Sequence, residues 1–222
     1  MATFEEFEFR TATPDDLEAV MEFTNTVFIR QAPVSKTAGL GREESELFYR
    51  PAVVKGLQTP YSVLVFHRAS GELIGYRIVS VWRREDADNT SVSMDGLPTR
   101  LRLLGGVLLS LKNSFWDLCP KEVNCVLRRE FSCVRSDFQR KGIASRMANE
   151  LLDEEELKAK GIGGIVSETS SVANQALLAK KGFKPLLEIF YGSVVDEEGV
   201  QVIGDRCVDG STKIVLNFKS FL

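Results

Sequence analysis

Polar and apolar residues follow strand patterns in seven separate stretches of the chain. Regular alternation places every second side chain on one face of a sheet. The predicted strands cover residues 6–12, 61–66, 73–82, 130–134, 165–168, 186–191 and 212–218. The second and third strands flank a short turn, 68–72, that contains a glycine. This spacing is typical of an antiparallel hairpin.

Apolar residues at helical spacing predict four helices. They cover residues 14–32, 97–115, 145–160 and 172–181. The first should end before Pro33, because a residue that precedes proline avoids helical geometry, and the last ends at Gly182. The polar stretches 35–46 and 86–96 are expected to be irregular. With no internal repeat or change of composition, the chain is predicted to form one α/β (α+β) domain over residues 1–222.

Composition and charge narrow the classes of protein. The 222 residues are 44% hydrophobic, with a net charge of -3, so the chain can bury a core and has no general attraction to polyanions. We expect no nucleic-acid partner. No stretch reaches the roughly 18 apolar residues that a membrane span requires, and segment 1–6 is acidic, unlike a signal peptide. A cytoplasmic protein without a membrane partner is expected.

Cysteine and histidine usage gives no metal signature. The four cysteines form no C-x-x-C pair, and the chain has a single histidine, His67. We therefore expect no metal site, and reduced, mostly buried thiols. His67 ends an apolar strand pattern, which favours a structural role over a catalytic one.

The turn Gln139–Ala144 is the strongest candidate for chemistry. It joins a predicted strand to a predicted helix, whose first N–H groups lack partners and favour an anion. Gly142 permits a close backbone approach, Ala144 should keep the packing tight, and Arg140 and Lys141 add positive charge. The alternative is an ordinary helix start with a solvated basic patch. The spacing matches neither a Walker A loop nor a dinucleotide fingerprint.

This turn belongs to a larger pattern. Val134 precedes it by five residues, and Asn174–Phe183 follows about thirty residues later. Together they resemble the paired core motifs of GNAT acyl-CoA N-acyltransferases. The resemblance implies a mixed central sheet that is splayed at the acyl-CoA site and flanked by helices, with acetyl-CoA or another acyl-CoA as co-substrate. The implied cofactor contacts are Cys133, Val134, Gln139, Arg140, Lys141, Gly142, Ile143, Ala144, Ser145 and Asn174.

Segment 27–34 and the pair Phe190-Tyr191 most resemble animal arylalkylamine N-acetyltransferases of the insect dopamine type. That resemblance implies transfer of an acetyl or short acyl group to a small primary arylalkylamine by direct attack. Where those enzymes carry an aspartate and a glutamate, this chain has Gln31 and Ala32. Where many relatives carry a proton-donating tyrosine, it has Leu178.

Other residues must therefore supply the base and the acid. Glu130, four residues before Val134, is expected on the same strand face as Val134, near the thioester, unless it only pairs with Arg128 or Arg77. The acids Glu43, Glu44 and Glu46 are alternative bases, and a solvated charge run is the simpler explanation for them. Ser171 is a candidate proton donor, with Ser167 and Ser170 as alternatives, and each could equally cap a helix or form a turn.

Two further functions stay open. A GNAT-fold protein could bind acyl-CoA without turnover, or it could acetylate a peptide or protein amine through a wide acidic groove. The aromatic residues Trp82, Trp116, Phe115 and Tyr76 could form an apolar acceptor pocket or simply belong to the core.

Overall fold

A computed structural model describes residues 4–86, 94 and 96–222. Most of segment 86–96 and the start of segment 1–6, for which the sequence makes predictions, lie outside the described residues. Within these described residues, seven strands form one sheet. They are β1 (Phe7–Thr11), β2 (Val63–His67), β3 (Leu73–Arg83), β4 (Cys125–Val134), β5 (Gly164–Thr169), β6 (Lys184–Phe190) and β7 (Lys213–Ser220).

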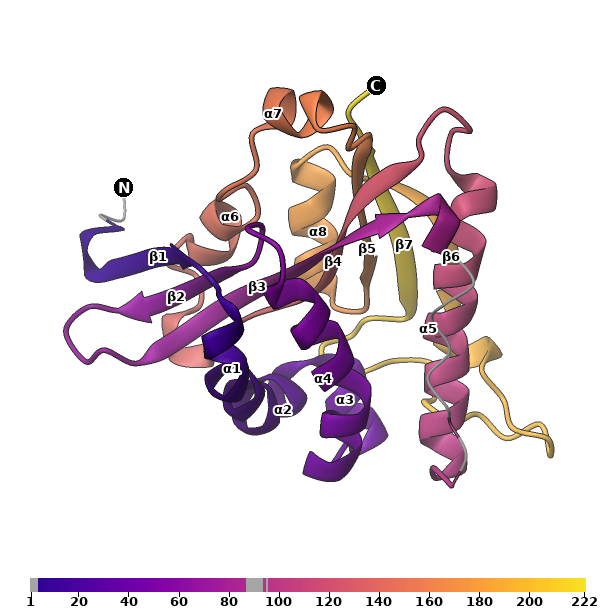
Figure 1. The fold of residues 1–222 in the computed structure, drawn as a ribbon. Coiled ribbons are helices and arrows are strands. Elements are labelled where there is room, and N and C mark those ends of the chain that lie inside the picture. Colours follow the sequence, from indigo (N-terminus) through magenta and orange to yellow (C-terminus); the bar gives the residue numbers. More distant parts are fainter. Residues whose placement is uncertain (1–3, 87–93, 95) are drawn as a thin grey trace.

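The sheet is mixed and runs in the order β1-β2-β3-β4-β5-β7-β6 (Figure 1). The central neighbours β4 and β5 are parallel, whereas the other neighbouring pairs are antiparallel. The predicted hairpin is confirmed, since β2 pairs antiparallel with β3. The seven predicted strands all occur, and β4 begins five residues earlier than the pattern indicates.

Helices cover both faces of the sheet. The helices are α1 (Leu17–Phe23), α2 (Ile29–Gln31), α3 (Pro33–Ala38), α4 (Arg42–Leu57), α5 (Thr99–Leu118), α6 (Ile143–Met147), α7 (Glu154–Ala159) and α8 (Val172–Lys180). A π-helical segment, Thr24–Phe28, joins α1 to α2. Helices α1 to α5 lie against one face, and α6 to α8 lie against the other (Figure 1).

Each face has its own apolar core. On the side of α4 and α5, Trp82 and Leu216 are buried in one cluster and Tyr76 in another. On the side of α6 and α8, Leu178 and Ile143 are buried. Alternation along the strands produces this division, because neighbouring residues of one strand face opposite sides.

Helix α4 contradicts the irregular structure predicted for residues 35–46. Its start is capped by Glu44, whose carboxylate accepts a hydrogen bond from the Gly41 N–H at 3.1 Å. Pro51 lies inside the helix, where it removes one backbone donor. Burial of Val53 and Leu57 stabilises the helix despite this proline. Burial of these apolar side chains therefore stabilises a helix that begins in a stretch which the polar sequence predicts to be irregular.

The single helix predicted over residues 145–160 is also wrong. It is divided into α6 and α7, and Leu151 between them has φ of 60°. The buried guanidinium of Arg77 donates hydrogen bonds to the backbone carbonyls of Met147 and Glu150. These carbonyls are thus satisfied from the sheet rather than by a continuing helix. Asp153 then caps α7 by accepting the N–H of Glu156 at 2.9 Å.

The predicted ends of two helices and the free, mostly buried cysteines are confirmed. The first helical stretch ends at Gln31, before Pro33, and Gly182 follows α8 with φ of 87°. All four cysteines are unpaired thiols, and three of them are buried. Within the described ranges, no helix has the length and apolar character of a membrane span. No group of three metal-ligating side chains occurs in these same ranges.

Candidate active site

The parallel strands β4 and β5 separate part-way along the sheet. They pair over only three positions, Leu127–Arg129 against Ile165–Ser167. Beyond these positions β4 stays with β3, and β5 stays with β7. The sheet is therefore splayed at its centre, as the resemblance implies. A point where parallel strands diverge at their carboxyl ends is a frequent position for ligands.

Glu130 lies in a β-bulge at the point of separation. The register of β4 against β3 skips one residue between Arg129 and Phe131, which leaves Glu130 as the extra residue. Bulges redirect side chains and interrupt alternation. Glu130 and Phe131 therefore line the same cavity, whereas Val134 packs in the core of the opposite face. The prediction that Glu130 shares a strand face with Val134 is wrong.

Arg128 holds two carboxylates at this position. Its guanidinium lies 3.3 Å from Glu130 and donates to Glu168 at 3.0 Å. Ser80 Oγ donates to the other oxygen of Glu130 at 2.6 Å. The carboxylate side chains are 9% and 6% exposed. Burial tends to lower the pKa of Arg128, but Glu130 and Glu168 raise it above its usual value. The predicted pairing with Arg128 is confirmed, while Arg77 is used elsewhere.

Lys112 brings a second buried cation to this group from α5. Its Nζ lies 5.7 Å from the centre of the Trp82 ring, and the residue is only 9% exposed. Within the described ranges it forms no hydrogen bond or ion pair. Burial, reinforced by Arg128, lowers the pKa of Lys112 to about 8 despite Glu130 and Glu168.

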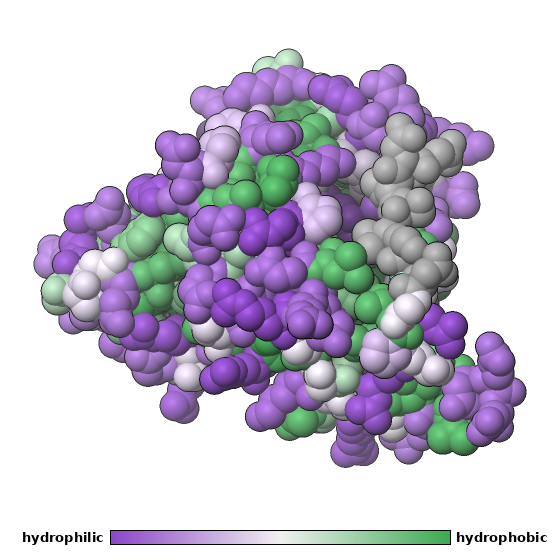
Figure 2. All heavy atoms as spheres, turned by 60° about the horizontal axis from the view of Figure 1, so that its bottom comes forward, coloured by the Kyte–Doolittle hydropathy of each residue, from purple (hydrophilic) through white to green (hydrophobic). Residues whose placement is uncertain are grey.

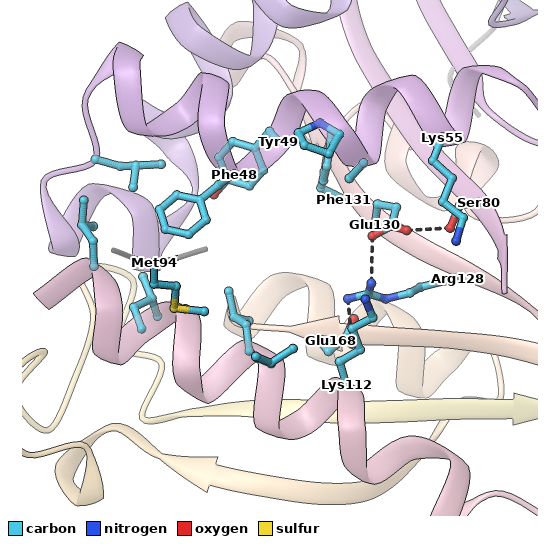
Figure 3. A pocket seen from close by; sticks show the side chains of 18 of the residues that line it. Phe48, Tyr49, Lys55, Ser80, Met94, Lys112, Arg128, Glu130, Phe131 and Glu168 are labelled. Atoms are coloured by element: carbon cyan, nitrogen blue, oxygen red, sulfur yellow. Dashed lines mark hydrogen bonds and ion pairs between the residues drawn. The ribbon is translucent and has the colours of Figure 1, made fainter. Parts of the chain in front are cut away.

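A cavity of about 400 Å³ leads away from these charges, between α4, α5 and the sheet. Phe48, Tyr49 and Met94 lie at one end, and the charged group lies at the other (Figure 3). Leucines of α5 form the wall between them. The molecular surface on the side of α1–α4 is mostly hydrophilic, with small separate apolar patches (Figure 2).

Among the four aromatic candidates, Trp82 lines this cavity. Phe115 and Trp116 pack in the core beside it, and Tyr76 packs in the cluster around α1 and α4. Their role is therefore to support the cavity rather than to line it.

The turn 139–144 forms a concave run of backbone donors. Arg140 and Gly142 both have positive φ, of 62° and 82°, which makes a backbone nest suited to anions. No acceptor for the N–H groups of residues 140–145 is found within the described ranges. Left-handed geometry is costly for a non-glycine residue such as Arg140 and is concentrated at functional sites.

The side chains around this turn divide into buried and exposed groups. Ile143 is 1% exposed and packs with Val134. Ala144 is exposed, so the expectation that it tightens the packing is wrong, although its small side chain leaves the N–H groups accessible. Ser145 is also exposed. The Nζ of Lys141 lies 5.1 Å from the centre of the Phe138 ring.

Gln139 connects the turn to β4 and to the first helical region. Its Nε2 donates to the Val134 carbonyl and to Gln31 Oε1, each at 3.0 Å. The sequence had singled out Gln31 only as the position of a lost carboxylate. The neighbouring strand residue Cys133 is largely shielded, and burial raises the pKa of its thiol to about 12. A neutral thiol fits a passive contact better than a nucleophile.

Ser171 and Asn174 lie at the start of α8, on the β5 side of the separation. Ser171 is the N-cap, because its Oγ accepts the Asn174 N–H at 3.2 Å. The capping alternative is thus confirmed, while the hydroxyl proton of Ser171 stays available. Leu178 is fully buried in the core, so the tyrosine position of the resembling enzymes has become a packing position.

The acidic residues of α4 do not line the cavity. Glu44 caps the helix, and Glu46 accepts hydrogen bonds from Asn25 at 2.6 Å and Arg50 at 2.7 Å. Glu43 is exposed. The solvated charge run is confirmed for this segment.

The sequence did not single out Lys112, Glu168 or Ser80 as site residues. One signal was present for the lysine, because residues 104, 108, 112 and 115 follow helical spacing and Lys112 interrupts their apolar face. Glu168 similarly follows the buried strand residue Val166 with one residue between them. A charge placed on an apolar stripe is the pattern that points to a buried site.

Several solved structures share this architecture. The arylalkylamine N-acetyltransferase 2 of Aedes aegypti matches over 98% of this chain and 100% of its own, with a TM-score of 0.77 and 16% identity. The C-terminal condensation domain of Ebony in complex with beta-alanyl-dopamine matches over 99% and 100%, with a TM-score of 0.73 and 16% identity. NAA60 of Arabidopsis thaliana in complex with acetyl-CoA matches over 96% and 99%, with a TM-score of 0.53 and 16% identity.

These similarities establish the fold. The chain has the fold of the GNAT N-acetyltransferases, and the resemblance to arylalkylamine N-acetyltransferases is confirmed at the level of structure. No family model matches the chain, and no curated protein matches it in sequence.

Proposed function

We propose that this protein is an acyl-CoA-dependent N-acyltransferase that transfers an acetyl or short acyl group to a primary amine with an aryl or alkyl body. The supporting observation is the separation of β4 and β5 beside a buried carboxylate and an apolar cavity. The chain would act as a single domain over residues 1–222. A structural neighbour that contains acetyl-CoA and another that contains beta-alanyl-dopamine support the two ligand classes.

The turn 139–144 would hold the pyrophosphate of the acyl-CoA. Its nest of N–H groups and the charges of Arg140 and Lys141 suit a diphosphate. The same proposal assigns Ser145 to the phosphates, and Cys133, Val134 and Asn174 to the pantetheine arm. Ile143 fixes the turn through its buried side chain.

The amine would attack from the cavity. Its nitrogen bonds to the thioester carbonyl carbon, the carbon–sulfur bond breaks, and an amide and a thiolate result. Glu130 would accept the proton that the nitrogen loses, because it is a buried carboxylate that lines the cavity and directly follows the last paired residue of β4. The hydroxyl of Ser171 would pass a proton to the thiolate and take one up from solvent in the same step, since its cap hydrogen bond uses only the oxygen lone pair.

The cavity wall favours an apolar acceptor body. Phe48, Met94 and the leucines of α5 offer no partner to a second cationic group, and burial of an unpaired charge is costly. An aryl or branched alkyl group is therefore a better occupant than a polyamine chain. Of the α4 acids that a protein-substrate groove would use, Glu44 and Glu46 are engaged elsewhere.

Two measurements test the proposal together. Titration of the protein with acetyl-CoA should show binding, and a thiol-release assay with phenethylamine, tryptamine, agmatine and a lysine peptide should show turnover with the apolar amines. Binding without release from any acceptor would favour an acyl-CoA-binding protein. Absent binding would contradict the proposal.

Glu130→Gln separates chemistry from binding. Loss of a general base lowers kcat by about 10²- to 10⁴-fold, and the acetyl-CoA affinity should stay within twofold of the wild type. The matched control, Glu43→Gln, removes an exposed carboxylate of α4 and should leave both quantities unchanged. Equal kcat in Glu130→Gln and the wild type would remove Glu130 from the mechanism.

A further inference from the structure

The charged end of the cavity contains two anions and two cations. Glu130 and Glu168 supply the negative charges, and Arg128 and Lys112 supply the positive ones (Figure 3). This group is therefore balanced before any ligand enters. An ammonium ligand would add one uncompensated positive charge to a buried site, which is unfavourable at low dielectric.

The hydrogen bonding of the four groups is uneven. Both carboxylates contact Arg128, and Glu130 also accepts from Ser80. Lys112 has no such partner within the described ranges, although the residue is only 9% exposed. An ammonium group carries three donors, and the Lys112 residue that bears it lines the cavity, where its Nζ is not one of the fully buried atoms without a partner. A ligand carboxylate in the cavity would accept from these donors.

Lys55 adds a third cation to the charged end of the cavity. It lines the same cavity from α4, and its side chain lies near Ser80 and Glu130 (Figure 3). With Lys55 counted, the lining residues carry three cations and two anions. Both the balance of charge and the unpartnered Lys112 therefore favour a ligand that carries a negative group beside its amine.

The remaining wall determines the rest of the ligand. Beyond the charged end, the cavity is lined by Phe48, Met94 and leucines of α5. A molecule that matches every part has an amine and a carboxylate at one end and an apolar body at the other. An α-amino acid with a large apolar side chain has this chemistry, and it enters as a zwitterion of zero net charge.

We infer that the acceptor is an apolar or aromatic α-amino acid, whose carboxylate is bound by Lys112 together with Arg128 and whose amino group faces Glu130. This inference rests on the proposed transferase function and narrows its substrate class. The product would be an N-acyl amino acid. The reaction balances as before, because the carboxylate takes no part in bond formation.

Paired ligands test the inference directly. L-phenylalanine and phenethylamine differ by the carboxylate, and so do L-leucine and isoamylamine. Equilibrium titration should show tighter binding of each amino acid than of its amine to the wild-type protein. The thiol-release assay with acetyl-CoA should give a higher kcat/KM for the amino acid of each pair.

Lys112→Met identifies the responsible cation. The ratio of amino-acid to amine affinity should fall roughly 10- to 100-fold, the usual value of a charge-assisted hydrogen bond. Lys112→Arg, which keeps the charge, should restore part of the ratio. Lys121→Met, which removes an exposed lysine just beyond the same helix, should leave the ratio unchanged.

The outcomes separate the two proposals. Tighter binding of amino acids without thiol release would overturn the transferase function and support the ligand class. Thiol release with a ratio that favours the amines, or that Lys112→Met leaves unchanged, would support the transferase and overturn the carboxylate site. Failure of both amino acids and amines to bind would overturn the inference in every form.

Discussion

Gly105 offers a direct test of which ligand group occupies the cavity. It lies on α5 and lines the cavity, where a Cβ would stand 2.8 Å from Met94 Sδ and 3.5 Å from Phe48 Cε1. A leucine at this position would displace the end of Met94 and occupy space beside Phe48. Methionine is flexible enough to move. Gly105→Leu should therefore fold and should shorten the cavity at its apolar end.

The expected effect follows from the lost space. Each methylene of the acceptor body that no longer fits forfeits about 0.8 kcal/mol. A leucine side chain excludes about three such groups, so a large acceptor should lose about 2.4 kcal/mol, or roughly 60-fold in kcat/KM. A small acceptor with the same polar end should lose little, because it does not reach Phe48. Binding of acetyl-CoA should not change.

The assay compares small and large acceptors of one head group in the thiol-release reaction. Gly106→Leu is the matched control, because a Cβ at Gly106 meets no atom within 4 Å and both variants gain the same helix propensity. Equal preference for large acceptors in Gly105→Leu and Gly106→Leu would refute the placement of the acceptor body in this cavity. Loss confined to long acyl-CoA donors would instead place the acyl chain there.

Three further predictions concern stability and binding. Gly56→Ala should destabilise the protein by about 1–3 kcal/mol in urea unfolding, because its Cβ would lie 2.4 Å from Ile78 Cγ2, whereas Gly106→Ala should stabilise it by about 1 kcal/mol. A Gly56→Ala protein that is at least as stable as the wild type would contradict the packing of α4 against Ile78. Gly142→Val should weaken acetyl-CoA binding, measured by titration, at least tenfold, because a β-branched residue resists φ of 82°; unchanged affinity would contradict the nest. The pKa of Lys112 falls from 10.5 to about 8 on folding, so the unfolded chain binds more protons between these values and stability rises with pH. Wild type should gain about 3 kcal/mol over Lys112→Met between pH 7 and pH 11, and parallel pH profiles of unfolding free energy would refute the burial of this ammonium group.

The strands are predicted well from local sequence patterns. Each face of the sheet packs against its own core, and neighbouring side chains of a strand point to opposite faces. Alternation is a property of two or three neighbouring residues, and it survives in β2 and β7. The helices α4 and α6 were not predicted correctly, because distant partners decide them. Val53 stabilises α4 from within the core, and Arg77 ends α6 by donating to its carbonyls from the sheet.

The candidate cofactor turn could be found from sequence, since its chemistry belongs to a short continuous segment. Residues 139–144 can be recognised because a predicted strand, a glycine and a predicted helix follow one another along the sequence. The left-handed Arg140 could not be foreseen, because most non-glycine residues avoid that geometry.

The charged end of the cavity depends on a one-residue irregularity. Without the bulge, alternation would place Glu130 on the same side of β4 as Val134, away from Phe131. The bulge instead reverses the faces of the residues after Glu130, so that Glu130 and Phe131 both line the cavity, where Arg128 also reaches Glu168 on the neighbouring strand. A single deletion at this position would thus restore regular pairing and remove the carboxylate from the site while it keeps every other strand residue. The geometry of this candidate site depends on the register between strands, which is why residue spacing alone wrongly placed Glu130 and Val134 on one face.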